Sequence, residues 1–349
     1  MIARFSDPID NSIRSISTPQ SAFRNFTTDR GDAGRRLDLV LRRHLTDVDA
    51  ATRTRVQKWI ADGCVTVNGA AVRRVSSRAA LGDTVAIAIP AADVPPRREM
   101  MAAEDAPLEV LYEDAHLMAV NKPAGLIVHP SYRHPAGTLL NALLWYARAW
   151  TGDERPSLVG RLDKHTSGVI IVAKTRAIHA ALQKALASSR GEKEYLALVY
   201  GRPPARGRID LRLRNDPNDR RIIIASTTAG AESVTTFERI GRVKAPRVGA
   251  ALLRCRLLTG RTHQIRVHLA SSGWPIVGDQ VYGTPRWQEI GDTEVAAALR
   301  DFPRQALHAS RVAFIHPVTS ARVVVTAPIP HELTHLFTNC RLHANTIGV

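Results

Sequence analysis

The chain has 349 residues, 44% of them hydrophobic, and its 48 Lys and Arg residues outnumber its 32 Asp and Glu residues. This length exceeds that of one ordinary domain, so two domains with flanking segments are expected. The net charge of +16 favours a phosphate-rich partner, RNA or DNA. No apolar run has the length of a membrane span, and the N-terminus lacks the layout of a signal peptide, so we expect no membrane partner.

The cysteines and histidines argue against a metal centre. Cys64, Cys255 and Cys340 lie far apart and form no CxxC pair, so neither a disulfide framework nor a thiolate zinc site is expected, which fits a reducing cytoplasm. His263 and His268 are five residues apart and would point to different faces of a helix. We therefore expect a cytoplasmic protein without a bound metal.

The first 90 residues divide into a leader and a small domain. Residues 1–33 show little apolar periodicity and predict a disordered basic leader, with order beginning near Arg35. Residues 34–90 predict two short helices and a small sheet. The evidence is helical spacing of Leu37, Val40, Leu41 and Leu45, then of Val56, Trp59 and Ile60, followed by a hairpin at Asn68-Gly69 and the alternating Val85, Ile87 and Ile89.

Basic residues crowd this small domain and far outnumber its acidic residues. Arg36, Arg53, Arg55 and Lys58 are the RNA-binding candidates, although a charged run is often only a solvated surface. The stretch resembles the α-L RNA-binding domain of a small-subunit ribosomal protein and of tyrosyl-tRNA synthetases. The resemblance rests on RLDxxL at residues 36–41, RxxVQKWIxxGxVxVNG at residues 53–69 and GDxV at residues 82–85.

A Pro-rich linker, residues 91–106, is expected to join this domain to a larger one at residues 107–335, followed by a tail at residues 336–349. The larger domain has many short strands, few helices and no regular βα alternation, which predicts an α+β fold. The expected strands are 117–120, 169–172, 194–200, 250–257, 311–315 and 322–327. A helix is expected over residues 176–188, and residues 285–302 are expected to form an excursion with a short helix.

The familiar cofactor and nucleophile motifs are missing from the sequence. It contains no GxSxG elbow, GxxxxGK[ST] phosphate loop, GxGxxG after a strand or HExxH. Serine hydrolases, ATPases and nicotinamide enzymes are therefore disfavoured, and we expect a reaction that needs no cofactor.

The segment at residues 158–168 places one carboxylate, Asp163, between Arg161 and Lys164 on a turn that enters a buried strand. The two cations would hold a phosphate backbone near the carboxylate, and cleavage of a glycosidic bond uses such a group. The alternative is that Asp163 caps the turn or pairs with Arg161, as loop aspartates commonly do.

Two further segments carry candidate residues. Around Arg261, Thr262 is a plausible N-cap of a helix whose amides could receive phosphate, and Arg266 could pair with a buried carboxylate or be a surface arginine. His263 and His268 are expected to be structural hydrogen-bonding groups. Tyr195 alternates with strand residues and either belongs to the core or stacks on an extruded base.

Together these segments resemble the RluA-type family of pseudouridine synthases over about residues 35–335. The matching blocks are NKPAGLIVHP (121–130), RLDKxTSG (161–168), KxYLALVYG (193–201), LxTGRTHQIRVHL (257–269), GDxxYG (278–283) and RxALHASRVxFxHPxT (304–319). The sequence departs from the family pattern at Gly160, where the family usually has His, and at His165, where it often has an acidic residue.

The resemblance implies a mixed, mostly antiparallel sheet of the pseudouridine synthase type and a role for each matching residue. Asp163 would be the catalytic aspartate, Arg161 would displace the target nucleotide, Tyr195 would stack on the flipped uracil and Arg266 would pair with the aspartate. Arg161, Lys164 and Arg261 are expected to contact RNA.

The predicted function is isomerisation of uridine in structured RNA by a monomeric enzyme. Its substrate is expected to be large-subunit ribosomal RNA, since the combination of domains is most similar to synthases of that class, and transfer RNA is the alternative. Two other classes stay open: a non-catalytic RNA-binding or ribosome-assembly factor, and a glycosylase that releases free uracil.

Overall fold

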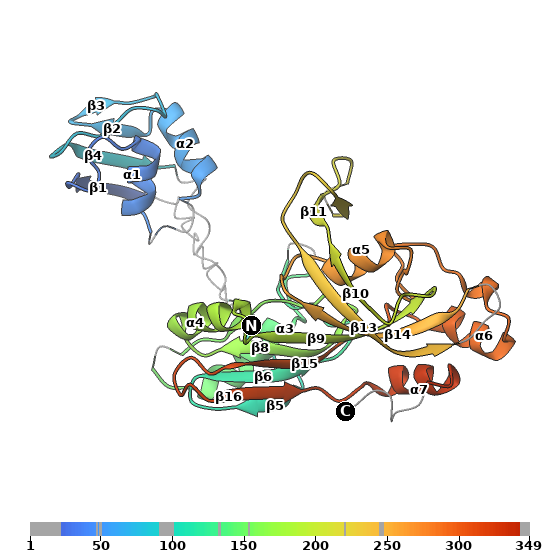
Figure 1. Ribbon diagram of the computed structural model, residues 1–349. Coiled ribbons are helices and arrows are strands. Elements are labelled where there is room, and N and C mark those ends of the chain that lie inside the picture. Colours follow the sequence, from blue (N-terminus) through green and yellow to red (C-terminus); the bar gives the residue numbers. More distant parts are fainter. Residues whose placement is uncertain are drawn as a thin grey trace, which may run out of the picture. The chain divides into compact units, whose positions relative to one another are not determined.

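A computed structural model describes residues 22–46, 48, 51–90, 101–131, 134–152, 154–219, 221–243 and 248–342. The chain divides into two compact units between Met100 and Met101, within the expected linker (Figure 1). Residues 91–100 of that linker lie outside the described residues, as do residues 1–21 of the expected leader and 343–349 of the expected tail. No helix in the described ranges has the length and apolar character needed to cross a membrane.

The N-terminal unit packs two helices against a four-stranded sheet with the order β1-β4-β2-β3. Its elements are β1 (Ala22–Thr27), α1 (Leu37–His44), α2 (Arg53–Ala61), β2 (Val65–Val67), β3 (Ala70–Ala71) and β4 (Thr84–Ile89). The two helices, the hairpin and the closing strand confirm the predicted elements, and the apolar positions that predicted them are all buried. Asn68 and Gly69 both have positive φ, as the predicted tight hairpin turn requires.

Strand β1 corrects the prediction of a disordered leader through residue 33. Residues 22–27 pair antiparallel with the whole of β4, so order begins at least 13 residues before Arg35. Phe23, Arg24 and Asn25 are exposed, and only Phe26 packs partly against the core. The strand is held mainly by backbone hydrogen bonds at a sheet edge, which explains why the sequence shows no apolar alternation there.

The C-terminal unit contains one long sheet with the order β10-β13-β14-β9-β15-β8-β6-β5, to which β16 and β7 add at β15 and β8. Only the β15–β8 pairing is parallel, so the predicted mixed, mostly antiparallel sheet is confirmed. Its strands are β5 (Glu109–Glu113), β6 (Leu117–Lys122), β7 (Ser157–Val159), β8 (Ser167–Ala173), β9 (Glu192–Tyr200), β10 (Arg206–Asp210), β13 (Val234–Val243), β14 (Ala250–Leu257), β15 (Leu307–Ile315) and β16 (Arg322–Thr326). A separate hairpin pairs β11 (Arg212–Asn215) with β12 (Ile223–Ser226).

The helices of this unit lie over the sheet and at its ends (Figure 1). They are α3 (Leu139–Tyr146), α4 (Arg176–Ala187), α5 (Gln264–Ser271), α6 (Thr293–Asp301) and α7 (His331–Asn339), with short 3-10 turns η2 (Ala147–Ala149) and η3 (Trp287–Glu289). The predicted helix at 176–188 is confirmed as α4, with Leu182 fully buried. The predicted excursion at 285–302 contains η3 and α6.

Two predicted boundaries differ from the structure. The tail expected from residue 336 begins inside α7, where Leu333, Leu336 and Phe337 are buried in the core of the sheet domain. The spacing of these apolar residues is helical, and Cys340 and Leu342 continue the buried face. The last part of the expected linker is also fixed: the Asn141 side chain donates to the Ala102 carbonyl at 2.7 Å.

Candidate active site

Asp163 lies in the loop between β7 and β8, and the backbone around it is tightly constrained. The Thr166 amide donates to the Asp163 carbonyl at 3.1 Å, closing a turn. Gly168 then has a φ of +114°, and a Cβ at this position would lie 2.1 Å from the Ala309 carbonyl oxygen on β15. Only glycine fits there, because both the left-handed backbone and the contact with β15 exclude a side chain. The parallel pairing of β8 with β15 thus fixes where the loop leaves the sheet.

Two buried side chains, Lys122 and Arg304, hold this loop from behind. Lys122 at the end of β6 is fully buried, and its ammonium donates to the carbonyls of Pro123, Leu126 and Lys164 at 2.8, 2.9 and 3.1 Å. Arg304, before β15, donates to the His165 carbonyl at 3.0 Å. Both residues belong to matched blocks, but no local sequence pattern indicates that they support the Asp163 loop.

The electrostatics of these supports follow from their burial. Burial, followed by the positive charge of Arg304, lowers the pKa of Lys122 to about 7, against a smaller opposing effect of Asp163. Arg304 also donates to Ser167 Oγ at 3.2 Å and to Glu332 of α7 at 2.8 Å, and Gln305 donates to Thr166 Oγ1 at 3.1 Å. The loop therefore rests on hydrogen bonds from elements that are distant in sequence.

Arg266 joins Asp163 to a second carboxylate, Asp279. Its Nη1 donates to Asp163 Oδ2 at 2.9 Å, while Nε and Nη2 donate to the two carboxylate oxygens of Asp279 at 2.7 and 2.8 Å. Arg266 and Asp279 are 7% and 1% exposed, whereas Asp163 is 22% exposed. The bidentate pair with Asp279 fixes the plane of the guanidinium, so that the remaining Nη1 points to Asp163.

This arrangement decides between the alternatives that the sequence left open. Arg266 is a buried partner of Asp163, not a surface arginine. Burial by itself lowers the pKa of Arg266, but hydrogen bonding and charge from Asp279, with the charge of Asp163, outweigh burial and raise that pKa above its usual range. Arg161 does not pair with Asp163: its Nη2 donates to Thr262 Oγ1 at 2.8 Å.

His263 also lies close to Asp163. This contact was not predicted, because His263 was expected to have only a structural role. Its Nε2 lies 3.7 Å from Asp163 Oδ1, and its Nδ1 lies 2.7 Å from the Tyr282 hydroxyl. Burial lowers the pKa of His263, partly opposed by the negative charge of Asp163. His268, by contrast, is fully buried against Thr235 and Ser233, as expected of a structural group.

The predicted N-cap at Thr262 is wrong. His263 adopts the left-handed conformation with a φ of 54° and occupies the cap position, so α5 begins at Gln264. The Thr262 hydroxyl accepts a hydrogen bond from Arg161 Nη2.

Asp163, Arg266 and Tyr195 all line one cavity of about 520 Å³. Its wall comes from the loop before β8, from β8, α4 and β9, and from the segment between β14 and α5. Tyr195 is half-buried on β9, and burial, followed by the nearby charge of Asp163, raises the pKa of its hydroxyl well above the usual range. Among the described residues that line the cavity, Asp163 is the one acidic side chain, and the basic ones are Arg161, Lys193, Arg261 and Arg266.

The other predicted RNA contacts fall in both units. In the C-terminal unit Lys164 is exposed, and exposed Arg261 uses Nε to donate to the Glu232 carbonyl at 3.2 Å. In the N-terminal unit Arg53, Arg55 and Lys58 are exposed on α2. Arg36 is instead half-buried, because its guanidinium pairs with the buried Asp38 through two hydrogen bonds.

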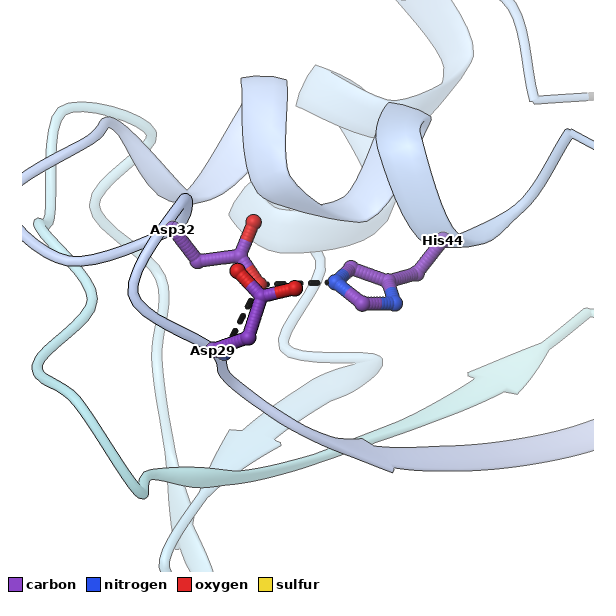
Figure 2. Close-up of side chains that lie close together, drawn as sticks. All are labelled: Asp29, Asp32 and His44. Carbon is purple, nitrogen blue, oxygen red and sulfur yellow. Dashed lines mark hydrogen bonds and ion pairs between the residues drawn. The ribbon is translucent and has the colours of Figure 1, made fainter.

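A cluster of Asp29, Asp32 and His44 in the N-terminal unit has the residue types of a metal site (Figure 2). His44 Nε2 lies 2.8 Å from Asp32 Oδ2, and Arg43 Nη1 donates to both carboxylates at 2.7 Å. Burial by itself raises the pKa of Asp32, but the hydrogen bonds from His44 and Arg43 outweigh it and lower the pKa to about 2. The Arg43 guanidinium already supplies the positive charge, so we assign the cluster to an ion-pair network that fixes the chain after β1.

Comparisons with known proteins match both units. The profile of the RNA pseudouridylate synthase family matches residues 116–271, and that of the S4 domain matches residues 35–85. The chain is 40% identical over 319 residues to Ribosomal large subunit pseudouridine synthase D of Xylella fastidiosa, covering 91% of this chain and 92% of the relative. It is 38% identical to the protein of that name in Xanthomonas campestris, covering 96% of this chain and 95% of the relative.

Solved structures show the same fold. Human RNA Pseudouridylate Synthase Domain Containing 1 is 25% identical, with a TM-score of 0.50, and the match covers 69% of this chain and 90% of the human chain. Human RNA Pseudouridylate Synthase Domain Containing 4 aligns with a TM-score of 0.52 at 22% identity, covering 67% and 93% of the two chains.

Proposed function

Because the chain belongs to the family of RNA pseudouridine synthases, we propose that it isomerises uridines of large-subunit ribosomal RNA with Asp163 as its catalytic carboxylate. The relatives from Xylella fastidiosa and Xanthomonas campestris, which match most of the chain, carry a name that specifies the ribosomal large subunit. The S4 domain supports RNA as the substrate. Cytoplasmic location and a monomeric state stay predictions.

The observation that carries the proposal is that Asp163 is the one carboxylate among the described residues that line the cavity, whose charged lining is otherwise basic. Asp163 is partly exposed to that cavity, its far side is held by Arg266, and Tyr195 lines the same space. A uracil ring that enters the cavity would meet the Tyr195 ring as a stacking surface. The RNA target must leave its stack to reach this position, as in other enzymes that act on a base.

The reaction balances within the substrate. The bond between uracil N1 and ribose C1′ breaks, the retained ring turns, and a bond between C5 and C1′ forms. The proton on C5 leaves and N1 takes up a proton, so that substrate and product have the same composition. Asp163 assists cleavage by attacking the sugar or the base, by abstracting a sugar proton, or by stabilising positive charge on the sugar. Arg266 holds the carboxylate in place, and Arg161 supports the extruded strand from the rim of the cavity, where it is hydrogen-bonded to Thr262.

Replacement of Asp163 by Asn tests the assignment. Asp163→Asn keeps the size of the side chain but removes its charge, so release of tritium from RNA carrying 5-tritiated uridine should fall by at least about a thousandfold. RNA affinity should change by less than about threefold, because the cavity gains no bulk. A matched control is Asp301→Asn, which removes an exposed carboxylate paired with Arg300 at another surface. An Asp163→Asn variant as active as the control would reject the assignment.

Product analysis separates the enzyme from the other classes. A glycosylase would release free uracil, which chromatography detects, whereas a synthase leaves the base in the chain. A non-catalytic assembly factor would leave the uridines of ribosomal RNA unmodified in vitro. Mapping of pseudouridines in ribosomal and transfer RNA from cells without the protein identifies the substrate, and a loss confined to transfer RNA would contradict the ribosomal assignment.

A further inference from the structure

Lys193 is a cation in the cavity that the mechanism above does not use. It lies on β9 two residues before Tyr195, so the two side chains share one face of the strand, and both line the cavity. Lys193 is half-buried, and burial lowers the pKa of its ammonium group. Within the part of the chain that the structure describes, Lys193 Nζ has no hydrogen-bond or ion-pair partner.

The neighbouring acidic residues are committed elsewhere. Glu192 pairs with Arg311 and Arg322, both at 2.6 Å. Glu194, on the opposite face of β9 from Lys193, pairs with Arg256 at 2.6 Å. The remaining carboxylate at the cavity, Asp163, is bound to Arg266. None of these three carboxylates of the described residues is therefore paired with Lys193.

The position of the ammonium group indicates where its counter-ion would come from. A Cβ built on Gly260 would lie 3.8 Å from Lys193 Nζ, so the ammonium is next to the backbone of the turn between β14 and α5. Arg261 and Thr262 follow in this turn, and Arg161 is hydrogen-bonded to Thr262. Gly260 thus adds no side chain next to Lys193 Nζ, and a basic residue follows it in the turn.

We propose that Lys193 binds a backbone phosphate of the RNA, within about one nucleotide of the target uridine. A partly desolvated cation without a counter-ion is costly, and a phosphate brought by the substrate removes that cost on binding. Two residues span about 6.8 Å along β9, which is similar to the length of one nucleotide along an extended RNA backbone. A base stacked on Tyr195 therefore places a flanking phosphate near Nζ.

This inference rests on the proposed function and adds a positioning role to it. The phosphate is not a reacting group, so Lys193 would act on binding and alignment and not on bond cleavage. Removal of its charge should weaken binding of RNA and raise KM, with a smaller effect on kcat at saturating RNA.

The test is a double-mutant cycle between the side chain and single phosphates. Lys193→Met keeps the length of the side chain and removes its charge, and the RNA carries one uncharged methylphosphonate at each linkage flanking the target in turn. We expect Lys193→Met to weaken RNA binding by about tenfold. At one linkage the methylphosphonate should weaken RNA binding by the wild-type protein by a similar factor. The same methylphosphonate should weaken RNA binding by the Lys193→Met variant by less than about twofold.

Two control variants make the result specific. Lys184→Met removes a charge from the exposed side of α4, outside the cavity lining, and should leave both KM and the methylphosphonate effects as in wild type. Lys193→Arg keeps the charge and should recover most of the lost affinity, which a purely structural role of the lysine stem would not predict.

Two results would overturn the proposed phosphate site. One is that the losses of RNA affinity from Lys193→Met and from the methylphosphonate add at every linkage. The other is a Lys193→Arg variant that binds RNA as weakly as Lys193→Met does. The same measurements keep the two proposals apart. If wild-type protein binds the unmodified RNA but forms no pseudouridine, the proposed function fails, whereas the binding cycle still reports on Lys193.

Discussion

Replacement of Asp279 by Asn should damage the site from a position that does not reach the cavity. Asp279 is 1% exposed and accepts two hydrogen bonds from Arg266 and two from the amides of Val281 and Tyr282. Asn has one acceptor oxygen in place of two, so the amide nitrogen would face a donor of Arg266. The buried guanidinium would then depend on Asp163 alone for its counter-charge.

The expected cost follows from these contacts. One charge-assisted hydrogen bond is worth about 1.5–3 kcal/mol, and breaking a buried ion pair on one side costs about 3–5 kcal/mol. Since Asp163 still compensates part of the charge, we expect a loss near the lower end, about 3 kcal/mol of local stability. The kcat should fall by more than about tenfold, because the Arg266 plane that orients Asp163 is no longer fixed.

Native-state hydrogen exchange of α5 and of the 279–282 turn measures this local free energy directly. The control is again Asp301→Asn, since Asp301 is 62% exposed and its pair with Arg300 should contribute less than about 1 kcal/mol. Equal protection of α5 in the two variants, with equal kcat, would refute the reasoning that Asp279 holds Arg266 for Asp163.

Two further predictions concern the support of the Asp163 loop. Gly168→Ala should lower the free energy of unfolding by about 3 kcal/mol or more, measured by thermal unfolding. The control is Gly160→Ala, where φ is +93° and no atom lies within 4 Å of the added Cβ, so the loss should be only about 1–2 kcal/mol. Similar losses in the two variants would contradict the proposed contact of β8 with β15. Burial, partly opposed by the Ala327 carbonyl, lowers the pKa of His308 to about 4 in the folded protein. As the pH falls, the His308 imidazole is therefore protonated in the unfolded chain before it is protonated in the folded one. The free energy of unfolding should decrease as the pH drops from about 6.5 to about 4. The slope should reach at most about 1.4 kcal/mol per pH unit, and His308→Gln should flatten it; an unchanged slope in that variant would reject His308 as its source.

The small N-terminal domain was largely predictable because its elements are local and amphipathic. Val56, Trp59 and Ile60 repeat at helical spacing and are all fully buried, and Asn68-Gly69 has the backbone that its turn type requires. Strand β1 escaped prediction because an exposed edge strand has no buried face to impose a pattern. The start of the tail was misplaced because the buried face of α7 continues past residue 335.

The sequence by itself determined which residue types were available for chemistry: a carboxylate between two cations, a strand tyrosine and a helix arginine. Only the tertiary structure decided that Arg266 bridges Asp163 and Asp279 across separations of 103 and 13 residues. It also placed Lys122 and Arg304 beneath the loop and left Lys193 without a counter-ion in the described part of the cavity. Such pairings depend on which strands become neighbours, and local periodicity carries no information about contacts between segments that are distant in the chain.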